Sequence, residues 1–183
     1  ETADIYVVSG REPQGATWAP RFVYHGFRFV EVSGLDYKPE LSAFTGHVIY
    51  DEMTTTGRFE TSHPLVNQIH KNAYWGIRGN YRGMPTDCPQ RDERMGWTGD
   101  AQVFSPTAMY LEDTYAFYAK YLYDMAKEQS VLGGKVPHVV PSCGVEDAAC
   151  VWGDAACIIP WNLYLFYGDK SILEDQFVSM KSW

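Results

Sequence analysis

The hydrophobic pattern changes near residue 60, and this change limits the fold more than any other feature of the chain. Before it, apolar residues alternate with polar ones or cluster as β-branched and aromatic residues, which predicts strands at residues 5–8, 22–32 and 46–50. After it, apolar residues recur at helical spacing. The sequence therefore predicts a β segment followed by a mainly α segment, with the boundary between residues 58 and 59.

The helical segment is predicted to begin at Pro64, with Thr61 or Ser62 as the cap and proline in the first turn. Leu65, Ile69 and Ile77 follow on one face. Four further helices are predicted at residues 101–110, 112–129, 155–167 and 170–183. The last one reaches the end of the sequence without a terminating glycine or proline, which suggests that the natural chain continues.

Composition excludes several functional classes. At 183 residues the chain fits one domain, or a small domain and part of a larger one. A net charge of -8, from 15 Lys+Arg against 23 Asp+Glu, offers no basic surface to a phosphate backbone, so nucleic acid is not an expected partner. No run of about 18 apolar residues is present, and we expect no membrane partner. Localisation stays open.

The cysteines do not indicate a metal site. Cys88, Cys143, Cys150 and Cys157 contain no C-x2-C pair of the kind that structural zinc sites use. Whether any two of them form a disulfide depends on the compartment, which the sequence does not give.

Residues 87–100 concentrate chemistry that a core strand or a plain amphipathic helix does not carry. This segment holds four carboxylates, two arginines and an indole. Pro85 and Pro89 forbid a continuous helix through Asp87, so the acids are expected on irregular backbone between rigid elements. Gly96 and Gly99 are expected to let the chain turn sharply around Trp97. The segment therefore predicts a polar pocket that binds a polar ligand or performs acid/base chemistry.

Other interpretations of these residues remain open at this point. The same acids and arginines could form a solvated salt-bridge turn, with Asp100 capping the next helix. Calcium ligation by aspartates of this segment matches no known loop spacing, and a nucleophilic Cys88 lacks a placed histidine. His138, in an apolar run, is interpreted as a core or loop histidine. A further alternative function is a metal-dependent hydrolase, which would lose activity when a chelator removes the metal.

Three motifs together resemble the bacterial α-L-rhamnosidases of glycoside hydrolase family 78. Residues 87–104 (DCPQRDERMGWTGDAQVF) resemble the signature of that family. Residues 18–32 (WAPRFVYHGFRFVEV) resemble the end of the β-sandwich that precedes its catalytic domain, and residues 151–156 (VWGDAA) resemble a later loop-to-helix motif. The resemblance implies that residues 1–58 end a β-sandwich domain and that residues 59–183 begin an (α/α)6-barrel catalytic domain, giving a partial barrel.

The resemblance also implies roles for single residues. Glu93 matches the general acid that protonates the glycosidic oxygen, and Asp87, Arg91 and Asp100 match residues that bind rhamnose hydroxyls. Trp97 and Trp152 match aromatic walls suited to the apolar face of a 6-deoxy sugar. Asp154 is expected to cap the helix that starts near Ala155. No cofactor and no metal are implied.

The resemblance further implies inverting hydrolysis of terminal α-L-rhamnose from a glycoside or polysaccharide. Such a reaction needs a second carboxylate about 6.5 to 9.5 Å from the acid, and in this family that base lies downstream of the matched segment. The remainder of its own polypeptide is thus an expected partner, and this chain alone is expected to be inactive with several apolar faces unpartnered. The alternative function is a carbohydrate-binding or interdomain module without catalysis.

Overall fold

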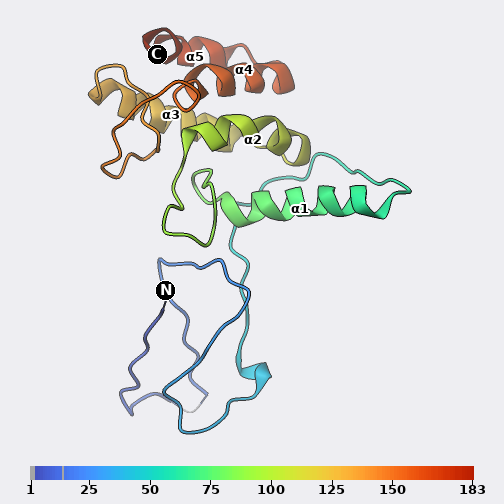
Figure 1. Ribbon diagram of the computed structural model, residues 1–183, viewed down its shortest axis with the longest axis vertical. Coiled ribbons are helices and arrows are strands. Elements are labelled where there is room, and N and C mark those ends of the chain that lie inside the picture. The colour runs from blue at the N-terminus through green and yellow to red at the C-terminus, as the bar shows by residue number, and fades with distance from the viewer. Residues whose placement is uncertain (1–2, 14) are drawn as a thin grey trace. The chain divides into compact units, whose positions relative to one another are not determined.

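The computed structural model describes residues 3–13 and 15–183, and the chain divides into two compact units, Glu1–Lys38 and Pro39–Trp183. Within the described residues the second unit contains one short 3-10 helix, η1 (Leu41–Ala43), and five α-helices (Figure 1). These are α1 (Pro64–Asn80), α2 (Thr98–Leu111), α3 (Tyr115–Val131), α4 (Ala155–Tyr167) and α5 (Ser171–Ser182).

The strands expected at residues 5–8, 22–32 and 46–50 are not formed, and this prediction is wrong for the structure. The described part of these segments is non-helical backbone that takes part in no β-ladder. A strand is defined by hydrogen bonds to a neighbouring strand, and alternating side chains alone do not supply that neighbour. Polar side chains provide local order instead, as when Glu12 accepts hydrogen bonds from Ser9 and Tyr6, which lower its pKa to about 2.

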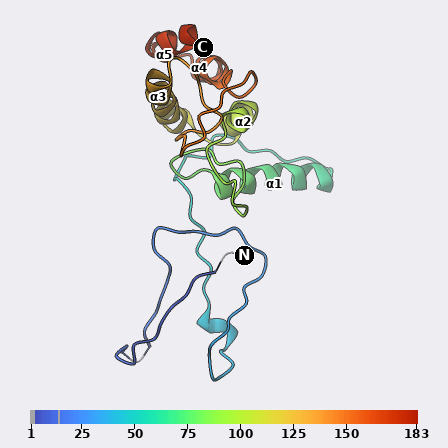
Figure 2. The same cartoon turned by 60° about the vertical axis from the view of Figure 1, so that its left-hand side comes forward.

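Helix α4 is central to the helical packing, because it contacts α2, α3 and α5 (Figure 2). Its sequence is apolar around most of its circumference, as expected for a helix with neighbours on several sides. The buried cluster it joins is the hydrophobic core of the second unit: Ile77, Tyr81, Ala101, Ala108, Met109, Leu111, Tyr118, Tyr121, Leu122, Met125, Val136, Val140, Ala155, Ala156, Ile159, Leu163 and Ile172.

All five predicted helices are present, and their starts show where the sequence signals were incomplete. Helix α1 has Pro64 in its first turn as expected, but His63 occupies the N-cap position and makes no side-chain cap. Asn67 instead accepts a hydrogen bond from the Thr61 amide at 2.8 Å and donates one back to the Thr61 carbonyl at 2.8 Å. The helix start is thus fixed by an asparagine inside the helix.

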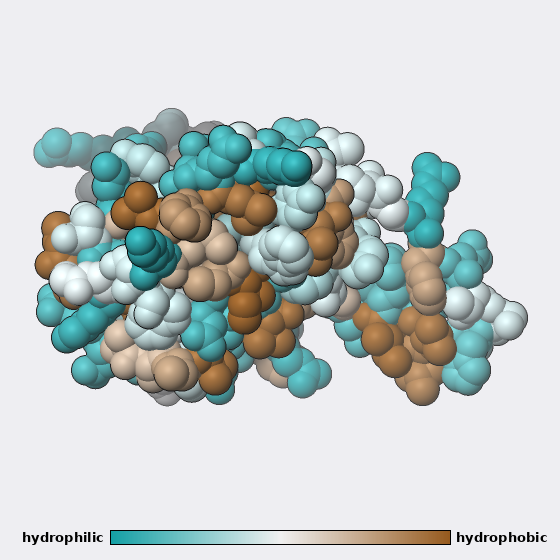
Figure 3. Space-filling model, turned by 90° about the horizontal axis from the view of Figure 1, so that it is seen from above, coloured by the Kyte–Doolittle hydropathy of each residue, from teal (hydrophilic) through white to brown (hydrophobic). Residues whose placement is uncertain are grey.

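Several apolar side chains are exposed, as the partial barrel led us to expect. Leu65 and Ile69 on α1 are 63% and 60% exposed, and Trp161 and Leu165 on α4 are 50% and 59% exposed. Apolar (brown) side chains are visible at the surface in Figure 3. No helix in the described part of the chain is both long and apolar enough to cross a bilayer.

Backbone pairing joins the segment before α1 to the end of α2, next to a buried carboxylate. Thr54, Thr55 and Thr56 pair with residues 111–113 through backbone hydrogen bonds of 2.8 and 3.2 Å and an antiparallel bridge. Glu112, at the centre of this pairing, is 1% exposed, and its Oε1 lies 3.8 Å from Nε of Arg78. The guanidinium of Arg78 in turn lies 4.3 and 4.5 Å from the ring centroids of Tyr50 and Tyr74.

Substitution Glu112→Gln is expected to change how stability depends on pH. Burial raises the pKa of Glu112 above its ordinary value of 4.5, against the opposing effects of Arg78 and Tyr74. The folded state therefore holds this proton more tightly than the unfolded state, so the stabilisation is complete below pH 4.5 and is lost as pH rises through the folded pKa.

Thermal unfolding followed by circular dichroism between pH 4 and 7 measures this effect. The difference in melting temperature, wild type minus Glu112→Gln, should fall as pH rises. The fall corresponds to about 1.4 kcal/mol of unfolding free energy for each unit by which burial raises the pKa of Glu112. Glu60→Gln, at an exposed glutamate, is the control and should give a flat difference. A flat difference for Glu112→Gln as well would contradict the raised pKa.

Candidate functional site

The acid-rich segment forms an irregular loop, residues 81–97, between α1 and α2. Backbone and side-chain hydrogen bonds close it on itself. The amide of Asp87 donates to the carbonyl of Met95 at 3.2 Å, and the amide of Met95 donates to Oδ1 of Asp87 at 3.2 Å. The loop expected from Pro85 and Pro89 is therefore confirmed.

A second segment, residues 136–140, holds the end of this loop in place. The carbonyl of Gly96 accepts hydrogen bonds from the amide of Val140 at 2.9 Å and from the hydroxyl of buried Tyr121 at 2.8 Å. The amide of Thr98 donates to the carbonyl of His138 at 2.8 Å. A Cβ at Gly96 would lie 2.1 Å from the carbonyl oxygen of Val140. Glycine at 96 thus serves close backbone approach. The chain also turns sharply there as expected, because the amide of Trp97 donates to the carbonyl of Met95 at 2.9 Å across Gly96.

Glu93 lies beside Asp87 and is paired with an arginine. Asp87, Cys88 and Glu93 each offer one atom that could ligate a metal, and these three atoms lie within 4.8 Å of one another. Nη2 of Arg91 lies 2.6 Å from Oε1 of Glu93, with both side chains exposed. Such a donor set could hold a cation, but the guanidinium of Arg91 already supplies positive charge to Glu93. Cys88 and Glu93 in turn raise the pKa of Arg91.

A cavity of about 530 Å³ opens next to this loop. Three of the predicted site residues line it: Asp87 from the loop, Asp100 from α2 and Trp152 from the segment before α4. The rest of its wall is mostly apolar or small, with Asn80 and Thr86 as polar members: Gly76, Asn80, Tyr81, Pro85, Thr86, Gly99, Ala101, Val103, Phe104 and Val151. Two carboxylates and an indole around an otherwise mostly apolar hollow suit a ligand that has hydroxyl groups and an apolar face.

Asp100 differs from its expected position. It lies in the first turn of α2, whose N-cap residue is Trp97, so it is neither on irregular backbone nor the cap of the helix. An acid is favoured there because the first turn carries partial positive charge from unpaired amides. Loss of surrounding water raises the pKa of Asp100 even though the side chain is partly open to solvent, and the charges of Asp87 and Glu93 raise it further.

The two predicted tryptophan walls are held in different ways. Nε1 of Trp97 donates a hydrogen bond of 2.8 Å to the carbonyl of Glu93, which ties the indole to the backbone of the acid. Trp152 packs on the backbone of Gly99, where a Cβ would lie 3.0 Å from the indole Cδ1. Its own Nε1 is buried and has no hydrogen-bond partner among the described residues.

The structure thus gathers Asp87, Asp100 and Trp152 around one cavity. Glu93 lies beside Asp87 without lining that cavity, and neither Arg91 nor Trp97 lines it.

An unpredicted histidine joins this group. The ring of His138 lies between the two tryptophans, with its centroid 6.4 Å from that of Trp97 and 5.2 Å from that of Trp152. Its position in an apolar run favours a core role, and no sequence signal links it to the acid-bearing segment.

Asp154 occupies the N-cap position of α4 as expected, but it does not cap the helix with its side chain. Its two oxygens accept hydrogen bonds of 2.9 Å from the amide of Val151 and from Nε1 of Trp183. These bonds tie the loop before α4 to the end of α5. The four cysteines, all among the described residues, are free.

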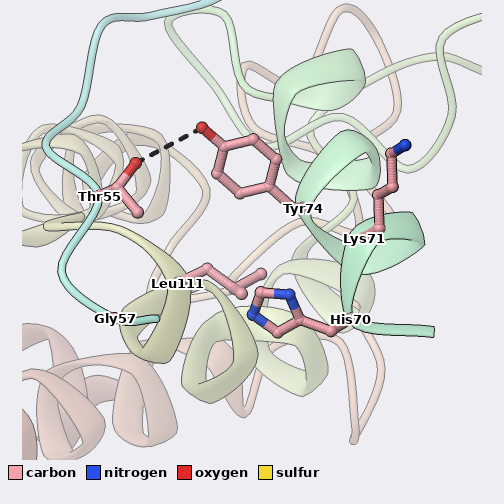
Figure 4. Close-up of a pocket in the computed structure, with 6 residues that line it drawn as sticks. All are labelled: Thr55, Gly57, His70, Lys71, Tyr74 and Leu111. Atoms are coloured by element: carbon pink, nitrogen blue, oxygen red, sulfur yellow. Dashed lines mark hydrogen bonds between the residues drawn. The ribbon is translucent and has the colours of Figure 1, made fainter. Parts of the chain in front are cut away.

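A second, smaller cavity of about 200 Å³ lies at the other end of α1 and α2 (Figure 4). His70 and Tyr74 of α1 point toward it, and the Tyr74 hydroxyl lies 3.4 Å from Oγ1 of Thr55. It holds no carboxylate among its lining residues. The acid-lined cavity is therefore the better candidate for a site with acid/base chemistry.

Two family models match the chain. The bacterial alpha-L-rhamnosidase 6 hairpin glycosidase domain matches residues 54–183, and the bacterial alpha-L-rhamnosidase concanavalin-like domain matches residues 1–50. The helical unit is accordingly part of a six-hairpin glycosidase domain. The chain belongs to the bacterial α-L-rhamnosidase family. This match confirms the expected fold class of a sandwich segment before a partial (α/α)6 barrel, although the strands expected at residues 5–8, 22–32 and 46–50 are not formed in the structure.

Curated relatives and solved structures agree with this assignment. The chain is 46% identical to an alpha-L-rhamnosidase of Formosa agariphila, covering 100% of the chain and 20% of the relative, and 42% identical to one of Streptomyces avermitilis, covering 98% and 17%. The chain thus spans about a fifth of the length of these relatives.

The structure of alpha-L-rhamnosidase from Dictyoglumus thermophilum has a TM-score of 0.85 at 41% identity, over 90% of this chain and 19% of that one. The Streptomyces avermitilis enzyme complexed with L-rhamnose has a TM-score of 0.70 at 41% identity, over 73% and 13%.

Substitution Gly96→Ala is expected to displace the acid-bearing loop. The added methyl group would meet the Val140 carbonyl at 2.1 Å, a distance that requires the backbone to move. Because two hydrogen bonds converge on the Gly96 carbonyl, we expect a loss of about 2 to 4 kcal/mol of stability, in the range of overpacking plus a lost backbone hydrogen bond. Chemical denaturation measures it.

Gly46→Ala is the matched control for this substitution, because a Cβ at Gly46 meets no atom within 4 Å. It should change stability by less than about 1 kcal/mol. Equal effects of the two substitutions would show that the contact between Gly96 and Val140 does not constrain the loop.

Proposed function

We propose that this chain, together with the remainder of its own polypeptide, forms an inverting α-L-rhamnosidase in which Glu93 is the general acid. The observation that carries the proposal is the placement of Glu93 beside Asp87, which lines a cavity together with Asp100 and Trp152. A carboxyl group next to a ligand cavity can protonate a leaving oxygen, and neighbouring carboxylates can hold the hydroxyl groups of the sugar.

The other residues take binding roles in this proposal. Asp87 and Asp100 accept hydrogen bonds from rhamnose hydroxyls inside the cavity, and Trp152 covers the apolar face of the sugar. Arg91 binds a further hydroxyl or ring oxygen. Since Arg91 is paired with Glu93 at 2.6 Å in the free protein, its engagement by the sugar would release Glu93 to meet the glycosidic oxygen.

Trp97 supports the acid in this proposal. Its indole donates a hydrogen bond to the carbonyl of Glu93, which fixes the backbone from which the acid extends.

Asp87 is too close to Glu93 to act as the base of an inverting reaction. An inverting pair is separated by about 6.5 to 9.5 Å to make room for water, whereas the nearest ligand atoms of Asp87 and Glu93 fall within 4.8 Å. Asp100 is assigned to sugar binding, so the proposal takes the base from another part of the polypeptide, and these 183 residues alone are inactive.

The proposed substrate is a terminal α-L-rhamnosyl group on a glycoside or polysaccharide. This substrate class is supported by the family of the chain and by the similarity to the Streptomyces avermitilis enzyme complexed with L-rhamnose. A 6-deoxy sugar also suits a hollow whose wall combines an indole and Phe104 with two carboxylates.

Substitution Glu93→Gln in the full-length polypeptide tests the central role. Removing the proton donor should lower kcat on an alkyl α-L-rhamnoside by about 10² to 10⁴, because an alkoxide leaves poorly without protonation. The loss should be much smaller on a 2,4-dinitrophenyl rhamnoside, whose leaving group needs little help. Steady-state kinetics on both substrates measures the contrast.

Asp92→Asn is the matched control, because Asp92 is an exposed acid of the same loop with no assigned role. It should retain near wild-type rates on both substrates. If Glu93→Gln also turns over the alkyl substrate at a near wild-type rate while rhamnose binding falls, Glu93 is a binding residue. The alternative function, a carbohydrate-binding module without catalysis, predicts no turnover by the wild type on either substrate.

A further inference from the structure

His138 lies at the centre of the aromatic group next to the acid loop. Its ring plane makes an angle of 24° with that of Trp97 and 53° with that of Trp152, at centroid distances of 6.4 and 5.2 Å. Neither tryptophan has another aromatic ring contact among the described residues. The imidazole is therefore the one ring that connects the two indoles in this part of the chain.

The two indoles differ in how firmly the rest of the protein holds them. Trp97 is fixed by its hydrogen bond to the carbonyl of Glu93 and by an antiparallel bridge to Val139. Trp152 has no hydrogen bond from its buried Nε1 within the described part of the chain, and it lies on the bare backbone of Gly99. Side-chain packing alone must hold the Trp152 ring against the cavity it lines.

Nε2 of His138 is not available to a ligand. That atom is buried and has no hydrogen-bond partner among the described residues. The backbone of His138 is fixed from both sides, because its amide donates to the carbonyl of Asp147 and its carbonyl accepts from Thr98, each at 2.8 Å. A ring on such an anchored backbone is a rigid support for its neighbours.

We propose that His138 is a positioning residue that holds Trp152 in place as a wall of the sugar cavity, by packing its ring between Trp152 and the anchored Trp97. The kinetic consequence of this role rests on the proposed rhamnosidase function. His138 acts through the aromatic ring, so an aromatic residue without ring nitrogens can replace it and a small residue cannot.

The kinetic test uses the full-length polypeptide and 4-nitrophenyl α-L-rhamnopyranoside. Because Trp152 contacts the sugar equally in the ground state and the transition state, His138→Ala should raise KM by about 3- to 10-fold with kcat changed less than about twofold. His138→Phe should restore KM to within about twofold of wild type, because it keeps the aromatic contact.

His70→Ala is the matched control. His70 stacks on Phe59 at a centroid distance of 5.2 Å, toward the opposite end of α1 from the acid loop, so it makes the same kind of contact outside the site. It should leave KM unchanged. An unchanged KM in His138→Ala overturns the proposal, and so does a His138→Phe variant as impaired as His138→Ala, since that result would assign the role to the nitrogens.

A second measurement does not depend on turnover. In protein labelled with 5-fluorotryptophan, the ¹⁹F resonance of Trp152, assigned with Trp152→Phe, should shift or broaden in His138→Ala and recover in His138→Phe. An unperturbed resonance in His138→Ala overturns the positioning role. If the wild type lacks rhamnosidase activity, the proposed function fails, while the ¹⁹F spectra still decide the role of His138.

Discussion

The close approach of Gly96 to Val140 is the contact on which the candidate site depends. Two hydrogen bonds converge on the Gly96 carbonyl, from the Val140 amide and from buried Tyr121, and no room is left for a Cβ. This contact joins the loop between α1 and α2 to the loop that follows α3. Glu93 and Trp97 lie on either side of Gly96, so their positions relative to the cavity follow from it.

The charges of the site are arranged around this fixed backbone. Arg91 neutralises Glu93 in the free protein, while Asp87 and Asp100 face the same hollow, where the charge of Asp87 raises the electrostatic cost of ionising Asp100. A sugar with hydroxyl donors would satisfy both carboxylates. The site in the free protein is therefore polar and prepared for a hydrogen-bonding ligand, and ring packing holds its aromatic wall at Trp152.

Much of the helical fold could be predicted from the sequence, and the reasons are local. Helical periodicity and Pro64 predicted α1, and Pro85 and Pro89 predicted the loop that carries Asp87.

The strand predictions failed because the hydrogen bonds of a β-ladder come from a partner strand, which alternation of side chains does not specify. The prediction left Asp100 outside the helix, because residues 98–100 have weak helical propensity. In the structure a hydrogen bond from Thr98 to the carbonyl of residue 138 outweighs that propensity, and α2 begins at Thr98. The boundary near residue 58 and the roles of the six site residues stay predictions.

The sequence by itself determined the family of the chain, the order of its segments and the clustering of Glu93 with Asp87 and Arg91, because these follow from residue type and short spacing. Only the tertiary structure decided which of the acids share a cavity with Trp152, and that His138 lies between the two tryptophans. The physical reason is that these contacts join segments far apart along the chain, and no local pattern encodes which distant surfaces meet when buried helices pack.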